Sequence, residues 1–418
     1  MGDVRLPEQG RDWDSLRAQM VDFGQDDADW RNARTAVYVF HPGDDVLEVA
    51  KQAYALYQSE NALGPAAFPS LRRMESEVIS MGLGLLHGPE GACGNMTSGG
   101  TESILMAVKT CRDQARARGM DTRGAEILCP RSTHLAFDKA AQYFDLETVR
   151  IPVASDLRAD VAAMADAVNE RTIMLVGSAP CFPFGLIDPI EALSELALER
   201  QLWLHVDACV GGYFAPFARM NGLPVPAFDF ELEGVSSISA DLHKYGYAAK
   251  GASTIFHRSE AQREFQLFQC DDWMAGGMTT PTAAGTRPGG AVAGAWAVMN
   301  YLGEAGYREK ARIVTDTRQH LMDAIDAMDG LRTFGDPLLG LFTYGAENPD
   351  ELPIFQVWGE LKSRGWFTGL ITEPRGIHLM LSPSHAEVAD QYLADLEEAV
   401  KKVRDGGGEA GPTKATYA

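Results

Sequence analysis

Four short segments of the chain carry residues that could contact a reactive ligand: a glycine-rich turn, a histidine, an aspartate and a lysine. The turn is Ser98–Thr101 in "TSGGTES", His134 lies in "PRSTHLAFDKAA", Asp207 in "WLHVDACVGG" and Lys244 in "SADLHKYGYAAKG". Taken alone, each has an ordinary structural explanation: a capped turn, a residue beside a helix start, a strand-end carboxylate and a solvated lysine. The chemistry lies in their combination.

The turn consists of Ser98, Gly99, Gly100 and Thr101, and a helical pattern follows it in which Ser103 adds a further hydroxyl. The backbone N–H groups and the positive end of the dipole at a helix start favour an anion, and the hydroxyls of Ser98, Thr101 and Ser103 would assist. The turn is neither a Walker loop nor a GxGxxG fingerprint. A plain glycine turn with a Ser or Thr cap is the alternative.

Asp207 and His134 stand just where apolar strand-like runs end, which is the edge of a parallel sheet at which ligands collect. A carboxylate there must be paired or solvated, and a protonated ring nitrogen would pair with Asp207. A neutral imidazole at His134 can stack on a flat ring or help a proton to move. His205 and Asp207 are also possible metal ligands, but no third ligand stands at a useful spacing, so no metal is predicted.

Lys244 follows a strand-like run and should emerge at the same edge. A lysine that is partly desolvated and near another cation has a lowered pKa, and its amine becomes a nucleophile suited to imine formation. Because His243 and Lys250 are close in sequence, we expect a lowered pKa at Lys244. An anion at the turn, a flat ring at His134, a ring nitrogen at Asp207 and an aldehyde at Lys244 together match one ligand, pyridoxal 5'-phosphate (PLP).

The scaffold for these residues is predicted from an alternating pattern between about residues 90 and 260. Short apolar or β-branched runs such as "EILCP", "TIMLVGSAP" and "SSISADLH" alternate with amphipathic stretches such as "HLAFDKAAQYF" and "PIEALSELALER". This alternation predicts βαβ units, and hence an α/β domain with a mostly parallel sheet flanked by helices. The carboxyl ends of its strands would bring the four segments together.

Four regions are predicted along the chain. Residues 1–60 form an N-terminal arm, 61–303 the large PLP-binding domain, 304–404 a small C-terminal α+β domain and 405–418 a Gly-rich, disordered tail. A helical stretch from Pro288 to Met328, with a break near Gly303, leads from the large domain into the small one. In the small domain we expect strands near 332–344, 354–359 and 377–382, and a helix from His385.

Composition and charge exclude several classes of function. The 418 residues carry a formal net charge of -21, so the summed field repels nucleic acid and anionic membranes. No apolar run approaches the roughly 20 residues that span a bilayer, and the first residues lack the pattern of a signal peptide. The six cysteines contain no CxxC pair and are interpreted as reduced thiols. These features predict a cytoplasmic protein.

Five segments, in the same order, resemble the sphingosine-1-phosphate lyases within the group II decarboxylase branch of the fold-type-I PLP enzymes. They are "TSGGTESILMAVKTCRD", "STHLAFDKAA", "LHVDACVGG", "DLHKYGYAAKGAS" and "TPTAAGTRPGG". The resemblance runs from about Ala36 to Pro383 and so covers most of the chain. It implies the PLP-dependent transferase (aspartate aminotransferase, fold type I) architecture.

The resemblance also implies roles for the residues in these segments. Lys244 would be the Schiff-base lysine, Asp207 the partner of the pyridine nitrogen and His134 the residue stacked on the cofactor ring. The Ser98–Thr101 turn and His243 would hold the cofactor phosphate.

The resemblance also implies a contact between subunits. In "AAGTRPGG", Gly285 and Thr286 would reach over to the active site of a second subunit. The resemblance therefore implies a homodimer with shared active sites.

Substrate contacts are implied at further positions. Tyr38 matches a tyrosine that faces the substrate and is counted among the catalytic residues, while Lys250 matches a lysine near the substrate phosphate. Asn61 begins "NALGPAAFPSLRRME", a segment that resembles a substrate-binding stretch of the lyases. In that stretch Gly64 stands where the lyases have a phosphate-contacting histidine, which weakens the case for a phosphorylated sphingoid base.

Three more residues bear on the substrate. His87 and His41 are candidates to replace the missing histidine. Arg375, in "TEPRGIHLMLSP", stands where the lyases have an apolar residue or proline, and an arginine there could grip the carboxylate of an amino acid. An arginine on a surface turn is the alternative for Arg375.

The favoured function is a PLP-dependent carbon–carbon lyase. It would cleave a β-hydroxy amine, either a phosphosphingoid base or a related small β-hydroxy amino compound, to an aldehyde and an amine by retro-aldol chemistry. A PLP-dependent amino-acid decarboxylase is the second hypothesis, because the cofactor cleaves whichever bond the protein aligns. A PLP-binding protein without turnover is the third.

Overall fold

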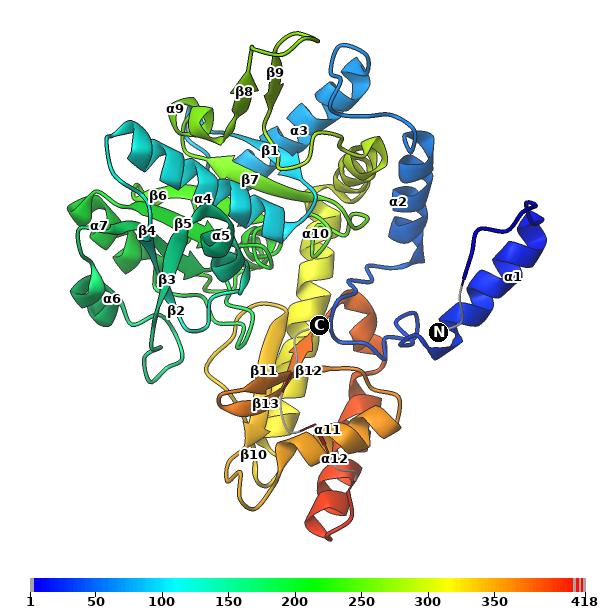
Figure 1. Cartoon of the computed structure of the whole chain (residues 1–418). Coiled ribbons are helices and arrows are strands. Elements are labelled where there is room, and N and C mark those ends of the chain that lie inside the picture. The colour runs from blue at the N-terminus through cyan, green and yellow to red at the C-terminus, as the bar shows by residue number, and fades with distance from the viewer. Residues whose placement is uncertain (1–3, 409–410, 413–414, 416–418) are drawn as a thin grey trace.

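A seven-stranded sheet forms the centre of the large domain in the computed structural model, which describes residues 4–408, 411–412 and 415 (Figure 1). The strands are β1 (Cys93–Thr97), β2 (Ala125–Pro130), β3 (Leu146–Ile151), β4 (Thr172–Ser178), β5 (Trp203–Asp207), β6 (Val235–Ala240) and β7 (Ser253–His257). Their spatial order is β1-β7-β6-β5-β4-β2-β3. Only β7 runs against its neighbours, so the prediction of a mostly parallel α/β sheet is confirmed.

Helices cover this sheet, and its central strands are therefore buried throughout. Every residue of β4 and β5 is buried, as expected for parallel strands that helices cover on both faces. The helices in this region are α4 (Gly100–Ala117), α5 (Ala136–Phe144), α6 (Val161–Ala167), α7 (Ile190–Arg200) and α8 (Ala215–Met220). Strand β1 is absent from the predicted strands because its sequence, "CGNMT", contains no apolar run.

The N-terminal region contributes α1 (Trp13–Phe23), η1 (Gly24–Asp26), α2 (Asp44–Leu56) and α3 (Pro69–Leu85). Figure 1 shows α1 standing away from the rest of the molecule, and none of its residues is buried. Helices α2 and α3 instead pack against α10 (Gly289–Asp326). Helix α10 breaks at Gly303, whose φ of 56° and ψ of -177° are not helical, so the predicted break is confirmed.

The small domain is a four-stranded antiparallel sheet in the order β10-β11-β13-β12. It comprises β10 (Leu331–Thr333), β11 (Leu341–Ala346), α11 (Ile354–Ser363), β12 (Gly369–Thr372), β13 (Arg375–Met380), η3 (Pro383–Glu387) and α12 (Ala389–Arg404). The predicted strand at 354–359 is wrong, because this segment is the start of α11. Its buried residues Ile354, Val357 and Leu361 recur at helical spacing, which a six-residue window is too short to reveal.

Between the two domains in sequence lie α9 (Glu260–Arg263), η2 (Glu264–Gln266) and a hairpin of β8 (Phe268–Cys270) and β9 (Met278–Thr280). All six cysteines are free. Within the described ranges, no helix is both long and apolar enough to cross a membrane. Part of the tail that is predicted to be disordered (409–410, 413–414 and 416–418) lies outside the described residues. The predicted domain boundaries remain predictions.

Candidate active site

A cavity of about 480 Å³ lies at the carboxyl ends of the parallel strands, and all four predicted segments line it. The turn follows β1, His134 follows β2, Asp207 ends β5, and Lys244 follows β6. We call this space the Lys244 cavity. Of the predicted residues, it is lined by Ser98, Gly99, Gly100, Thr101, His134, Asp207, His243, Lys244 and Lys250. The prediction that strand ends bring the four segments together is therefore confirmed. The roles of these residues stay predictions.

Lys244 is held by a carboxylate that the sequence argument did not consider. Its Nζ lies 3.1 Å from Oδ2 of Asp241, which is buried directly after β6. Oδ1 of Asp241 accepts a hydrogen bond of 2.5 Å from Ser253 Oγ. An aspartate three residues before the lysine in "ADLHK" was the available signal for this ion pair.

The ion pair reverses the expected pKa shift at Lys244. Burial alone would lower the pKa of Lys244, but the charges of Asp241 and Asp207 outweigh burial, and the net shift is upward. Burial alone would likewise raise the pKa of Asp241, but Lys244 and His243 bring it below its ordinary value. The prediction of a lowered pKa at Lys244 is therefore wrong, and the amine is protonated before any ligand is bound.

Asp207 presents one carboxylate oxygen to the cavity. The hydrogen bonds that it accepts, from Cys209 N at 3.1 Å and Ser239 Oγ at 3.4 Å, both involve Oδ1. The side chain is buried yet lines the cavity, so Oδ2 is the oxygen left for a donor from a ligand. A buried carboxylate gains from such a charged partner, as a protonated ring nitrogen would supply.

His134 is a neutral, oriented imidazole. Its Nδ1 accepts a hydrogen bond of 3.1 Å from the backbone N–H of Ala136, which places the ring proton on Nε2. Burial lowers the pKa of His134, with the nearby charge of Asp207 opposing the shift. Both the hydrogen bond and the direction of the pKa shift favour the neutral ring, which can stack on a flat ligand.

The turn at Ser98 offers fewer donors than expected. The N–H of Ser98 donates a hydrogen bond of 2.6 Å to Oε2 of Glu102, and Oε1 of Glu102 accepts from the N–H of Ala283 at 2.9 Å. Ser103 Oγ is buried between Thr97 Oγ1 at 2.6 Å and Ser253 Oγ at 2.9 Å, so the prediction that it assists an anion is wrong. Glu102 thus holds the turn, and the N–H groups after Ser98 remain for a ligand.

Gly100 fits a close approach of backbone to ligand. A Cβ at this position would come within 2.8 Å of Cys209 Sγ and 2.9 Å of both carboxylate oxygens of Asp241. Only glycine therefore allows the helix start to lie this close to the Lys244–Asp241 pair. Beside it, Nδ1 of His243 donates to the carbonyl of Ala252 at 2.7 Å, which fixes the ring at the cavity wall. These residues fit a phosphate with an attached ring and aldehyde.

Lys250 differs from Lys244 in its partners. Its Nζ donates to the carbonyl of Tyr38 at 2.8 Å and to the carbonyl of His243 at 3.2 Å. Desolvation of the amine, together with the nearby charge of Lys244, lowers the pKa of Lys250 to about 8. Tyr38 itself does not line the Lys244 cavity, but it has a left-handed φ of 64°, an unusual conformation for a bulky residue.

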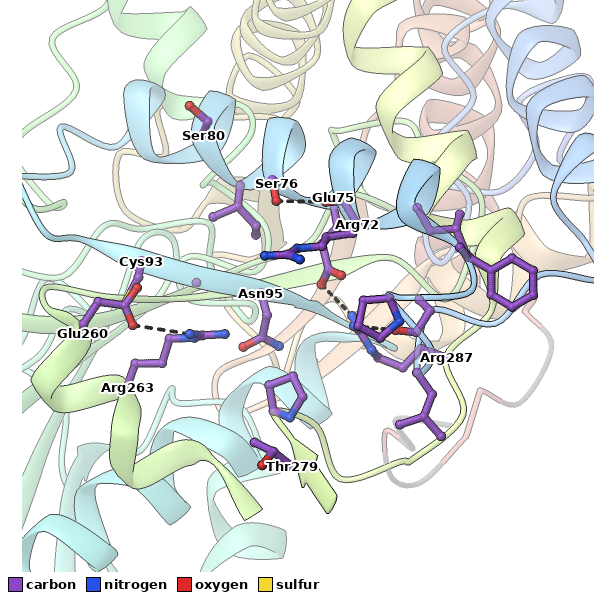
Figure 2. A pocket seen from close by; sticks show the side chains of 18 of the residues that line it. Arg72, Glu75, Ser76, Ser80, Cys93, Asn95, Glu260, Arg263, Thr279 and Arg287 are labelled. Atoms are coloured by element: carbon purple, nitrogen blue, oxygen red, sulfur yellow. Dashed lines mark hydrogen bonds and ion pairs between the residues drawn. The ribbon is translucent and has the colours of Figure 1, made fainter. Parts of the chain in front are cut away.

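Three predicted residues lie together at a different place. Asn61 Nδ2 donates to Thr286 Oγ1 at 3.3 Å, and Gly285 lines a cavity of about 620 Å³ that Figure 2 shows. In that cavity Arg287 pairs with Glu75 at 2.5 Å, and Arg263 pairs with Glu260 at 3.3 Å. Within one chain, Asn61, Gly285 and Thr286 therefore do not line the Lys244 cavity.

Arg375 also lies apart from the Lys244 cavity. It is the first residue of β13 and lines a cavity of about 250 Å³ beside α11, where its guanidinium lies 5.4 Å from the centre of the Phe355 ring. An arginine at this position does not face Lys244 in the same chain. The expected carboxylate grip therefore has no geometric support.

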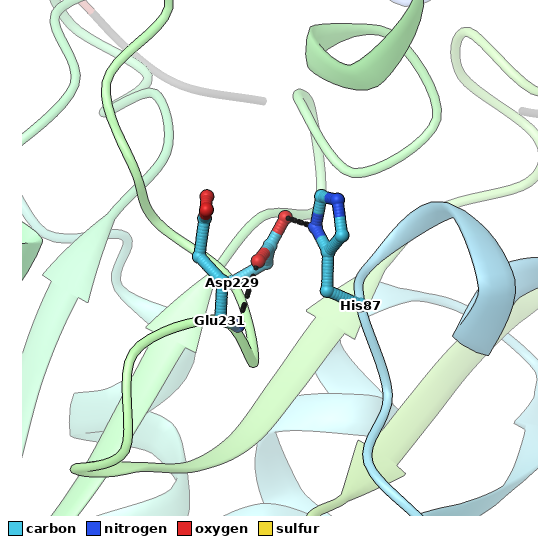
Figure 3. A group of neighbouring side chains, drawn as sticks. All are labelled: His87, Asp229 and Glu231. Carbon is cyan, nitrogen blue, oxygen red and sulfur yellow. Dashed lines mark hydrogen bonds and ion pairs between the residues drawn. The ribbon is translucent and has the colours of Figure 1, made fainter.

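His87 and His41, the two candidates for a replacement histidine, also lie elsewhere. His87 Nδ1 is 3.0 Å from Asp229 Oδ2, and with Glu231 these residues form a group whose ligand atoms could hold a metal ion (Figure 3). Arg219 already pairs with Glu231 at 2.9 Å. His41 lines a fourth cavity with Lys310. Neither histidine lines the Lys244 cavity.

Comparison with known families identifies the fold and the cofactor. The profile described as "Pyridoxal-dependent decarboxylase conserved domain" matches residues 37–341, and these include every residue named around Lys244. The chain belongs to this family. The pyridoxal-dependent decarboxylase family takes PLP as its cofactor, and the cavity described above has the residues to hold it.

Two curated relatives are sphingosine-1-phosphate lyases. The chain is 43% identical over 363 residues to the sphingosine-1-phosphate lyase of Arabidopsis thaliana, covering 86% of this chain and 66% of that protein. It is 38% identical over 401 residues to sphingosine-1-phosphate lyase 1 of Mus musculus, covering 95% of this chain and 70% of that protein. The chain thus spans about two thirds of the length of these relatives.

A solved structure agrees with the sequence comparison. The sphingosine-1-phosphate lyase of Burkholderia pseudomallei superimposes with a TM-score of 0.91 at 36% identity, covering 97% of this chain and 94% of that one. The fold of this lyase is therefore shared along almost the whole chain.

Proposed function

We propose that the chain is a PLP-dependent carbon–carbon lyase that cleaves a phosphosphingoid base, a phosphorylated long-chain 2-amino-3-hydroxy compound, to an aldehyde and a phosphorylated amine. The observation that carries the proposal is Lys250, a second lysine in the Lys244 cavity. In the described part of the chain its amine contacts backbone carbonyls and no carboxylate pairs with it, so its charge is available to a substrate phosphate. The identity to sphingosine-1-phosphate lyases supports the same substrate class.

The cofactor would be held at both ends of its ring. The N–H groups after Ser98, with His243 beside them, would bind its phosphate, and Asp207 would accept a hydrogen bond from the ring nitrogen. His134 would lie on the ring face, and Lys244 would attach the aldehyde carbon through its amine. When bound, PLP takes up the electron pair of the bond that breaks at the substrate Cα.

The choice of bond is a matter of how the protein orients the substrate. Lys250 would hold the substrate phosphate on one side of the cavity, which places the carbon that bears the hydroxyl at the other side. In the cleavage the Cβ hydroxyl loses its proton, the C–O bond becomes the aldehyde carbonyl as the Cα–Cβ bond breaks, and Cα gains a proton. Atoms and electrons balance without an oxidant or a further reactant.

An amino-acid decarboxylase is the weaker alternative. A carboxylate substrate is usually oriented by an arginine, which binds it with two parallel hydrogen bonds. No arginine is among the described residues that line the Lys244 cavity, and Arg375 lines another one. The geometry therefore supports a phosphate at Lys250 better than a carboxylate.

A product assay on the purified holoenzyme tests the proposal. Sphinganine 1-phosphate, a small β-hydroxy amino acid and aromatic and acidic amino acids are incubated in parallel, and aldehyde and carbon dioxide are both counted. We expect aldehyde from the phosphorylated substrate without carbon dioxide. Stoichiometric carbon dioxide from an amino acid would establish the decarboxylase instead, and turnover of none of them would leave a PLP-binding protein.

A homodimer with shared active sites is a second part of the proposal. Gly285 lines the cavity of Figure 2, the adjacent Thr286 accepts a hydrogen bond from Asn61, and none of the three lines the Lys244 cavity of its own chain, which suits a segment that serves a partner. A Cβ on Gly285 would meet only Met278 Cε at 3.7 Å and Leu63 Cδ2 at 4.0 Å, so a larger side chain fits its own chain. A cytoplasmic location stays a prediction from the sequence.

Subunit mixing tests the sharing. Gly285→Trp and Lys244→Ala should each be inactive as pure proteins, because each spoils every site of its own dimer. If sites are shared, mixed dimers contain one intact site, and an equal mixture should recover about a quarter of wild-type activity. Activity no higher than that of the pure variants would refute shared sites.

A further inference from the structure

A second cavity, of about 240 Å³, adjoins the Lys244 cavity and shares two of its lining residues, His134 and Phe182. We call it the side cavity. It lies between the loop after β2, the segment after β4 and strand β12 of the small domain. Its apolar lining residues are Leu135, Phe182, Pro183, Leu370 and Ile371.

The charged residues of the side cavity are already engaged. Arg150 pairs with Asp138 and donates to the carbonyl of Thr133 at 3.0 Å. Arg131 of the large domain pairs at 2.8 Å with Glu373, which directly follows β12 of the small domain. Because both guanidinium groups have protein partners, the side cavity offers a ligand mainly its apolar surface.

Strand register identifies the small-domain side chain that faces this space. In the β12–β13 pair Gly369 lies opposite His378, and Ile371 lies opposite Gly376. Opposed residues share a face of an antiparallel sheet, so Ile371 and His378 point to the same side. The His378 ring lies 4.5 Å from the Phe182 ring of the large domain. Ile371 therefore points toward Phe182 and the side cavity.

The size of the side cavity indicates what it can hold. Sites for whole drug-sized ligands usually measure at least about 300 Å³, so a space of about 240 Å³ that borders the Lys244 cavity at His134 and Phe182 suits part of a ligand already seated in the Lys244 cavity. Lys250 does not line it. The two adjoining spaces thus present a cation in one and apolar side chains in the other, the pattern of an amphiphile with an anionic end.

We propose that the side cavity binds the hydrocarbon chain of the substrate, and that Leu135, Phe182 and Ile371 make the enzyme select for chain length. This inference rests on the proposed lyase function and deepens it. Burial of each additional methylene should raise kcat/KM roughly fourfold until the side cavity is filled, after which the increase should stop.

Phosphorylated 2-amino-3-hydroxyalkanes of increasing chain length provide the first test on the wild-type holoenzyme. A rise of kcat/KM with chain length to a plateau is expected. A value that does not change with chain length would refute the side cavity while leaving the lyase function intact. Absence of aldehyde at every chain length would refute the lyase function itself, so the two failures are distinguishable.

Variants place the effect in the side cavity. Ile371→Trp should fill the space and lower kcat/KM for the longest substrate at least about tenfold, with less than about twofold change for the shortest. Val388→Trp is the matched control, because Val388 lines a different cavity of the small domain and should change neither value. Equal losses for both substrates in Ile371→Trp, or the same chain-length effect in Val388→Trp, would overturn the assignment.

A surface variant guards against misfolding of Ile371→Trp. Leu135 is 61% exposed, so Leu135→Ser removes an apolar wall with little effect on the core. It should lower kcat/KM for the longest substrate severalfold and leave the absorbance of bound PLP unchanged. An unchanged chain-length profile in Leu135→Ser would contradict the proposal even if the tryptophan variant did not fold.

Discussion

The cofactor side and the substrate side of the Lys244 cavity are built in different ways. The cofactor side consists of Ser98–Thr101, His134, Asp207 and Lys244, which stand at the carboxyl ends of β1, β2, β5 and β6 along one edge of one sheet. The substrate side draws on distant segments, since Lys250 contacts the carbonyl of Tyr38 and the side cavity is closed by β12 of the small domain. In the proposed function, one sheet edge would position the cofactor, whereas three parts of the chain would position the substrate.

The two lysines of the cavity also differ, in their partners and in the direction of their pKa shifts. Lys244 lies 3.1 Å from Asp241, and its pKa is raised above its ordinary value. Lys250 donates to two backbone carbonyls, lies 5.5 Å from the centre of the Phe40 ring and pairs with no carboxylate among the described residues, and its pKa is lowered to about 8. A buried carboxylate stands beside one amine and none beside the other, which is the difference expected if Lys244 serves covalent attachment and Lys250 serves recognition.

The largest effect is expected from the cofactor side. Lys244→Ala removes the amine that attaches the aldehyde and should lower kcat by at least about 10⁴-fold, as loss of a covalent residue does in other enzymes. Borohydride reduction followed by peptide mass analysis should locate PLP on Lys244 in the wild type and on no residue of the variant. Retention of more than one hundredth of the activity would contradict the assignment.

Asp207→Asn should have the next largest effect. The amide keeps the shape but removes the buried charge opposite the ring nitrogen, and loss of one partner of a buried pair costs about 3–5 kcal/mol, which corresponds to a loss of about 150- to 5,000-fold in kcat. Asp207→Glu is the matched control that keeps the charge and should lose less. A smaller loss in the amide variant than in the glutamate variant would argue against a charge role for Asp207.

The pH profile tests the substrate side. Because the pKa of Lys250 is about 8, its amine is charged below pH 8 and loses its charge as the pH rises through that value. In the wild type, kcat/KM for the phosphorylated substrate should fall up to about tenfold per pH unit above pH 8. Lys250→Arg keeps its charge and should flatten this limb. An identical alkaline limb in both proteins would exclude Lys250 as its source.

The smallest effect is expected at Arg375. Its guanidinium lies over Phe355 at a separate cavity, so Arg375→Ala should change kcat/KM less than about twofold for any carboxylate or phosphate substrate. Steady-state kinetics with both substrate types decide the matter. A rise in KM confined to carboxylate substrates would restore Arg375 as a substrate residue.

The residues of the cofactor side could be predicted because their positions depend on short local segments of sequence. Each of its residues stands at a recognisable strand end, and parallel strands place such ends side by side. Two contacts were nevertheless missed. Cations flank Lys244 in the sequence and mask its contact with Asp241, and the contact of Glu102 with the turn is masked because an acidic residue in the first helical turn is typical of an ordinary dipole partner.

The substrate side could not be predicted to the same depth, since it depends on long-range packing. Nothing near Ile371 in sequence reveals that β12 faces Phe182, and nothing near Arg375 reveals that it faces away from Lys244. The direction of the pKa shift at Lys244 could not be predicted either, because it depends on which charge lies closest in space. Local sequence therefore indicates which residues stand at strand ends, but it does not indicate which charged residue lies closest to a given side chain in space.

The most direct test of this division is a comparison of phosphorylated and unphosphorylated sphinganine in the wild type and in Lys250→Met. Loss of a hydrogen bond to a charged group costs about 1.5–3 kcal/mol, so kcat/KM for the phosphorylated substrate should fall about 10- to 100-fold in the variant. The unphosphorylated substrate should change less than about twofold, and the absorbance of bound PLP should not change. Equal losses for both substrates, or no loss for either, would contradict the assignment of Lys250 to the substrate phosphate.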